Sequence, residues 1–101
     1  MTPRKKAPVH PGEILANKFL EPLGLTQLRI AKDISVPTRR INEIVLGRRG
    51  ITADTALRLA RFFKTAEQFW LNLQGHHDLE VERDRLGDRL QREVIVLRRT
   101  T

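Results

Sequence analysis

The feature that most constrains the fold is residues 26–47, which read TQLRIAKDISVPTRRINEIVLG. Two short amphipathic segments in this stretch are separated by a break at Ser35-Val36-Pro37. Ala31 lies midway along the first segment, where a larger side chain would obstruct the second. The apolar positions that can lock the two segments together are Ile34, Val36, Ile41 and Ile44. This pattern predicts a helix-turn-helix, a motif whose second helix lies in the DNA major groove.

Composition narrows the class of protein. The 101 residues suffice for one domain with a modest core, and the absence of cysteine excludes disulfides and thiolate metal sites. That absence is compatible with the cytoplasmic location that we expect. No apolar run approaches about 18 residues, so we expect no membrane span. The basic start lacks the apolar stretch of a signal peptide, and we interpret residues 1–9 as a flexible arm.

Charge is distributed unevenly along the chain. Residues 1–64 hold 13 Lys and Arg against 5 Asp and Glu, whereas residues 65–101 hold 6 against 7. The basic excess coincides with the helix-turn-helix, so we expect this part of the chain to meet a polyanion. The plainer alternative is that the basic residues only keep the chain in solution.

The spacing of apolar residues predicts five helices and little strand. The residues expected to open them are Pro11, Thr26, Pro37 or Thr38, Thr52 and Thr65. The apolar face expected on the fourth helix is Ala53, Ala56, Leu57, Ala60 and Phe63. On the fifth helix, residues 66–74, we expect Phe69, Trp70 and Leu73 to close the core, and Gly75 to interrupt the helix. These helices predict an all-α domain over residues 10–79.

The remaining segment, residues 80–101, is expected to be an extension for dimer or partner contacts. An apolar stripe leads into it on a highly charged helix: Leu79, Leu86, Leu90, Val94 and Leu97. Either this stripe folds back onto the same domain, or it pairs with a second copy or another protein. Residues 94–97, VIVL, are either a short strand or a frayed helix end.

The start of the second motif helix carries the candidate base-reading residues: Thr38, Arg39, Asn42 and Glu43. Arg39 can fork onto guanine, and Asn42 can pair with adenine. Residues three or four apart on a helix share a face, so Arg39, Asn42 and Glu43 can point the same way. Glu43 either reads cytosine or orients Arg39. The plainer alternative is a surface ion pair between Arg39 and Glu43.

Five further residues flank that helix and are candidate phosphate contacts: Thr26, Gln27, Arg40, Arg48 and Arg49. Thr26 and Gln27 stand at a helix N-terminus, whose N–H groups favour a phosphate. The three arginines suit contacts that position the protein without reading sequence. In the arm, Arg4, Lys5 and Lys6 either follow the DNA backbone or a groove, or make no contact.

Metal binding and catalysis are not expected. His76 and His77 are adjacent, so on a helix they point about 100° apart and do not converge on one ion. His10 precedes Pro11 and is expected to act locally at the first helix start. No nucleophile–base set or glycine-rich phosphate loop is visible, so we expect no enzyme, cofactor or small-molecule substrate.

Three stretches together resemble the HigA family of antitoxins, within the Xre/Cro superfamily that includes the VapI-like plasmid-maintenance antidotes. They are HPGEIL at 10–15, residues 26–50, and TADTALRLARFFKTAEQFWLNLQ at 52–74. The resemblance covers about residues 10–80 and implies a lambda-repressor-like fold. By motif position it implies base contacts at Thr38, Arg39 and Glu43, and a phosphate contact at Gln27. Ser35 departs from the pattern, because glycine usually occupies this left-handed position of the turn.

The resemblance also implies partners and a function. HigA-like proteins neutralise a HigB-like, mRNA-cleaving toxin, and as homodimers they repress their own operon by binding double-stranded operator DNA. The expected function is therefore that of a type II antitoxin and autorepressor. The alternatives are a stand-alone Xre-type repressor without a toxin partner and a scaffold protein whose basic face is incidental.

Overall fold

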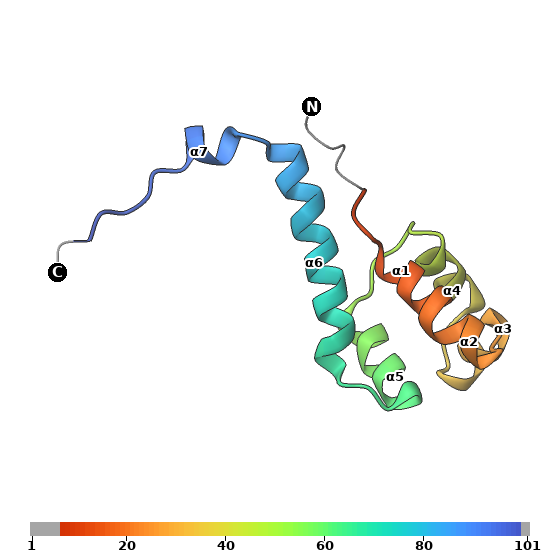
Figure 1. Cartoon of the computed structure of the whole chain (residues 1–101). Helices are drawn as coiled ribbons and strands as arrows, with labels where there is room; N and C mark the ends of the chain where they lie inside the picture. The colour runs from red at the N-terminus through yellow and green to blue at the C-terminus, as the bar shows by residue number, and fades with distance from the viewer. Residues whose placement is uncertain (1–6, 100–101) are drawn as a thin grey trace.

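The structure, a computed structural model, describes residues 7–99, and these residues form helices without a strand. The expected first helix is a continuous run of α1 (Pro11–Ile14), the π-helical segment η1 (Leu15–Leu20) and α2 (Glu21–Leu23). The others are α3 (Gln27–Asp33), α4 (Thr38–Val45), α5 (Ala53–Phe63), α6 (Glu67–Leu86) and the short α7 (Arg89–Glu93). The all-α, five-helix prediction is confirmed, with α7 added in the extension (Figure 1).

The first helix starts as the sequence predicts. His10 is the N-cap, and its Nδ1 accepts a hydrogen bond of 2.9 Å from the Gly12 N–H. Pro11 occupies the first helical position, where its missing N–H costs nothing. Gly12 lies so close to α4 that a Cβ there would be 1.8 Å from the Ile44 carbonyl oxygen. The HPG sequence therefore caps α1 and lets its backbone rest directly on α4.

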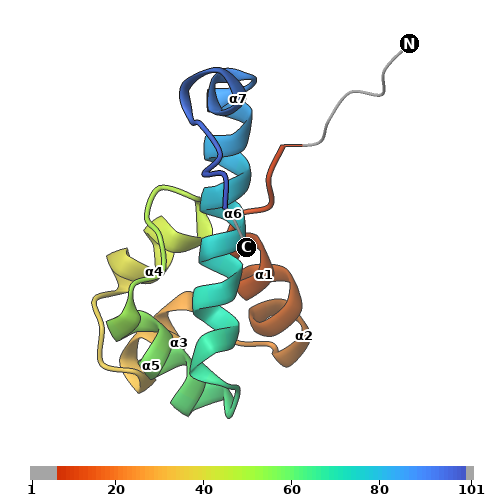
Figure 2. The same ribbon diagram turned by 90° about the vertical axis from the view of Figure 1, so that its left-hand side faces the viewer.

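The core lies among the helices of residues 11–63, and α6 closes it with Trp70. Figure 2 shows α6 as the long upright helix, with α1 and α2 on one side and α3, α4 and α5 on the other. Trp70 is fully buried, and its indole N–H donates to the Thr65 hydroxyl over 2.8 Å. Its ring lies 4.9 Å from Phe19 and 5.0 Å from Phe69. The prediction that Trp70 closes the core is confirmed, whereas Phe69 lies at its edge, 37% exposed.

The face predicted for α5 was wrong in part. The residues of α5 that are buried are Thr55, Ala56, Leu59 and Ala60. Leu57 is 51% exposed, and Ala53 is exposed as well. Because the helix has apolar residues on more than one side, its pattern permits two inward faces, and the packing of the whole domain places the face with Leu59 in the core. Thr55 tolerates burial because its hydroxyl accepts from that of Thr52, the N-cap residue of the helix.

The expected interruption at Gly75 was also wrong. Helix α6 continues without a break from Glu67 to Leu86, so the expected domain boundary at residues 79 and 80 lies inside it. One glycine costs a helix interior about 1 kcal/mol relative to alanine, which pairs along the helix can offset. One such pair is His76 Nε2 with Glu80 Oε1 at 2.8 Å.

Beyond α6 the chain leaves the helical body. Helix α7 and the segment after it lead away from the other helices (Figure 1). Residues 94–99 belong to no helix or strand, and Val94 already has an extended backbone. The apolar stripe is uncovered, since Leu79, Val94 and Leu97 are all exposed. Folding back onto the same domain is thus not what the single chain does.

Within the part of the chain that the structure describes, no helix combines the length and the apolar character needed to cross a membrane.

Candidate nucleic-acid interface

Helices α3 and α4 meet through a tight turn at residues 34–37. Ser35 has φ of 59°, the left-handed conformation expected from its position in the motif. For a residue with a Cβ this conformation costs about 1–2 kcal/mol. The turn is held by the N–H of Val36, which donates to the Ala31 carbonyl over 3.0 Å, and by the burial of Ile34 and Val36 on either side of Ser35. The predicted helix-turn-helix is therefore formed.

Helix α4 presents two different faces. Ile41 and Ile44 are fully buried against the core, as the sequence predicts. On the other side Thr38, Arg39 and Asn42 are exposed, and the side chain of Arg39 retains 81% of its accessible surface. Three of the four candidate base-reading residues thus lie on the open surface of this helix, while the fourth, Glu43, is half-buried.

The two residues at the start of α3 are both engaged within the protein. Thr26 is the N-cap, and its hydroxyl accepts a hydrogen bond of 3.0 Å from the Arg29 N–H. The Gln27 side-chain oxygen accepts one of 3.2 Å from the Asn42 amide group. This second contact joins the start of α3 to the exposed face of α4 and orients both amide side chains.

Glu43 faces the loop after α4. Its Oε1 accepts from Arg49 Nη2 at 2.7 Å and Nε at 3.0 Å, whereas Arg39 Nε is 3.9 Å away. Glu43 therefore pairs closely with Arg49. The Arg39–Glu43 ion pair considered from the sequence is present, but its distance is much longer. Gly47, with φ of 75°, turns the chain after α4, so that the exposed Arg48 and Arg49 follow α4 closely.

Arg40 points in another direction, toward α5. Its Nη1 donates to Asp54 Oδ2 over 2.7 Å, and its side chain is 28% exposed. A shallow open hollow nevertheless remains at the start of α4, lined by Pro37, Arg39, Arg40 and Arg49. Two of the three guanidinium groups at this hollow already pair with carboxylates, Arg40 with Asp54 and Arg49 with Glu43, so an anionic group such as a phosphate would share them with those carboxylates and would meet the exposed Arg39 most directly.

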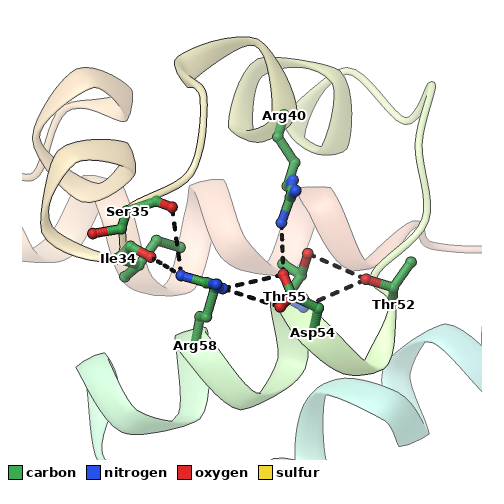
Figure 3. Close-up of polar contacts among 7 residues, drawn as sticks. All are labelled: Ile34, Ser35, Arg40, Thr52, Asp54, Thr55 and Arg58. Atoms are coloured by element: carbon green, nitrogen blue, oxygen red, sulfur yellow. Dashed lines mark hydrogen bonds and ion pairs between the residues drawn. The ribbon is translucent and has the colours of Figure 1, made fainter.

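Sequence reasoning missed two residues at this surface, Asp54 and Arg58 (Figure 3). Arg58 donates to Asp54 from Nε and to the Ile34 carbonyl from Nη1, the latter over 2.8 Å. The hydrogen bond from Arg40, and then the one from Arg58, lowers the pKa of the Asp54 carboxyl. The spacing of Asp54 and Arg58 could have indicated their pairing. Their partners Arg40 and Ile34 lie 14 and 24 residues away, beyond the reach of any local pattern.

His76 and His77 lie in the middle of α6, and His10 lies at the start of α1. The rings of His10 and His77 meet edge to face, with centroids 4.9 Å apart. Burial, followed by the proximity of His77, lowers the pKa of His10. Among residues 7–99 no group of three or more His, Asp or Glu side chains is arranged to hold a metal ion. The arm residues Arg4, Lys5 and Lys6 lie outside the described residues.

Comparison with known proteins gives consistent matches. A family model described as helix-turn-helix matches residues 17–70. Virulence-associated protein I of Dichelobacter nodosus is 53% identical over 73 residues, which are 72% of this chain and 68% of that protein. Antitoxin HigA-1 of Vibrio cholerae is 36% identical over 86 residues, which are 84% of this chain and 80% of that protein. The solved structure of the Pseudomonas aeruginosa antitoxin HigA with the higBA promoter superposes with a TM-score of 0.86 at 38% identity. The match covers 90% of this chain and 99% of that one.

Proposed function

Because this chain belongs to the HigA family of Xre-type helix-turn-helix proteins, we propose that it is an antitoxin that represses its own operon. In this proposal two copies bind operator DNA through α4 and a HigB-like toxin through another surface. The observation that carries the DNA part is the exposed face of α4 beside the hollow lined by three arginines. The similar P. aeruginosa HigA was solved with its promoter, which supports the same mode of binding. We expect no enzymatic activity.

The contacts to DNA divide into two kinds. Base edges are read by three exposed residues of α4 and one half-buried residue beside them: Thr38, Arg39, Asn42 and Glu43. Phosphates are bound by residues around that helix: Thr26, Gln27, Arg40, Arg48 and Arg49. At Thr26 the contact is made through the helix start, because the hydroxyl already caps α3. The basic arm, residues 1–9, adds sequence-independent attraction.

Repression requires two copies in this proposal. A dimer that places two α4 helices about 34 Å apart reads an inverted repeat in successive major grooves. The extension, residues 80–101, carries most of the uncovered apolar stripe that a second copy or a toxin would cover, since Leu90, Val94 and Leu97 are exposed.

The DNA part is tested by Arg39→Ala, assayed against a set of duplexes that vary one base pair at a time. Loss of a forked contact to guanine should cost about 1–3 kcal/mol at one position and leave the other positions unchanged. Arg29→Ala is the matched control, because it removes the same charge from an exposed position. Arg29, however, lies on α3, where it pairs with Asp33. Equal, uniform losses in the two variants would contradict base reading by Arg39.

The toxin part is tested by bacterial growth. Any small reading frame found beside the gene is induced alone and then together with this chain. Growth arrest that the chain relieves supports the antitoxin role. If the neighbour is harmless, or if arrest persists while this protein is abundant, the chain is better described as a stand-alone Xre-type repressor.

A further inference from the structure

The carboxylate of Asp54 lies where α4, α5 and the turn at residues 34–37 come together, next to the surface that we propose faces DNA. Asp54 is the second residue of α5, and its Oδ2 accepts from Arg40 Nη1 of α4 at 2.7 Å. Both of its oxygens also accept from Arg58 Nε, at 3.1 and 3.2 Å (Figure 3). One side chain thus holds two guanidinium groups, one from α4 and one from α5 itself.

Arg58 carries this linkage to the turn of the motif. Its Nη1 donates to the Ile34 carbonyl at 2.8 Å and lies 3.4 Å from the Ser35 carbonyl. Ile34 is the C-cap of α3, where carbonyl groups lack helical partners and the helix dipole favours a cation. Ser35 is the residue with the strained left-handed backbone. Arg58 therefore satisfies and holds the part of the motif with the least favourable local conformation.

The linkage runs along the surface of the domain and not through its core. Ile41 and Ile44 fix how deeply α4 is seated, because both are fully buried. Hydrogen bonds of defined geometry add an angular constraint to this packing at the exposed end of the helix. The charged contacts from Asp54 supply such geometry at the first turn of α4, next to Arg39.

We infer that Asp54 is a positioning residue for operator readout, which holds the first turn of α4 and the Ser35 turn without contacting DNA. This inference rests on the proposed function. A carboxylate beside a polyanion repels it, so Asp54 weakens binding to any DNA while it fixes the angle at which Thr38 and Arg39 meet base edges. Its lowered pKa keeps the carboxylate charged at the pH of ordinary binding assays.

The inference predicts two changes of opposite sign for Asp54→Asn. Binding to a shuffled duplex should become tighter, because one negative charge is removed. Binding to the duplex of its own promoter, relative to the shuffled one, should weaken about tenfold, comparable with one mismatched base pair. Substitution of a residue with only a structural role would weaken binding to both duplexes. Asp33→Asn is the matched control, since Asp33 is paired with Arg29 at 2.7 Å within α3. Asp54→Glu, which keeps the charge, should restore part of the selectivity.

Amide hydrogen exchange of the DNA-free variant gives a second readout. Asp54→Asn should speed exchange at residues 35–41 and leave the residues around Trp70 unchanged. Unchanged exchange at 35–41 would overturn the inference, as would promoter selectivity in Asp54→Asn equal to that in Asp33→Asn. If the wild-type protein itself does not distinguish the two duplexes, the proposed function fails, and operator positioning by Asp54 fails with it. That result is distinguishable because it appears before any substitution is made.

Discussion

The helical body, residues 11–74, and the extension, residues 80–101, both carry apolar residues at helical spacing, yet the buried ones among the described residues all lie in the body. Leu15, Ile41 and Leu59 are fully buried in the body, whereas in the extension Leu90 is 47% and Val94 is 59% exposed. The difference teaches that spacing identifies which residues share a face, while burial depends on whether another element is within reach. Inside the body each amphipathic helix has a neighbour to cover it. Past α6 the single chain offers none.

The largest effect expected in this comparison is that of Trp70→Ala. The substitution removes a fully buried side chain and its hydrogen bond to Thr65, so it should lower the free energy of unfolding by about 3–5 kcal/mol. Urea denaturation followed by circular dichroism measures the loss. Leu90→Ala, in the extension, is the contrasting variant and should change stability little. A wild-type denaturation midpoint for Trp70→Ala would contradict the described core.

The next effect concerns the contact between α1 and α4. In Gly12→Ala the new Cβ would meet the Ile44 carbonyl, so the two helices must separate, at a cost of about 1–3 kcal/mol. Gly75→Ala is the matched control, because a Cβ there meets nothing and the helix gains propensity. The midpoint temperature of thermal unfolding should therefore fall in Gly12→Ala and rise in Gly75→Ala. Equal shifts would show that α1 does not rest on α4 as described.

A smaller effect depends on pH through His10. The lowered pKa means that the unfolded chain binds this proton more readily than the folded one. The stabilisation is therefore complete above the ordinary histidine pKa and is lost as pH falls below it. Protonation removes the Nδ1 acceptor of the α1 cap, a contact worth about 1 kcal/mol.

The comparison that isolates this effect is between wild type and His10→Asn. Asparagine also caps helices but does not titrate, so its thermal stability should fall less between pH 7.5 and 5.5 than that of the wild type. Parallel losses in the two proteins would mean that other groups cause the acid sensitivity.

The smallest effect on the isolated chain is expected in the extension. Val96→Asp should change the free energy of unfolding by less than about 0.5 kcal/mol, because Val96 is 84% exposed. Melting at several protein concentrations sharpens this test. A deficit that appears only at high concentration would show that a second copy covers the extension. A deficit that does not depend on concentration would contradict its exposure in the single chain.

Much of this fold could be predicted because its signals are local. The cap at Thr26, the helix start at Pro11 and the break before Thr38 each depend on a few neighbouring residues. The inward face of α5 could not be predicted, because tertiary packing chose Leu59 over Leu57. The continuation of α6 past Gly75 was missed because a glycine lowers helix propensity without breaking a helix.

For the candidate site, the sequence indicated which residues lie on or near α4 but not how they pair. The exposure of Arg39 follows from helical spacing alone. The contacts of Arg40 with Asp54 and of Asn42 with Gln27 join residues 14 and 15 positions apart on different helices. Such pairings depend on how the helices are placed against one another, which no short-range pattern contains.

The most direct test of the central claim is the binding of the wild-type protein to its own promoter duplex and to a shuffled duplex, measured by fluorescence anisotropy across a range of salt concentrations. We predict that the promoter duplex binds at least about 10³-fold more tightly. We also predict that both affinities fall steeply with salt, with a slope near 0.9 per phosphate contact on logarithmic axes. Equal affinity for the two duplexes, or binding that salt leaves unchanged, would contradict operator recognition by α4.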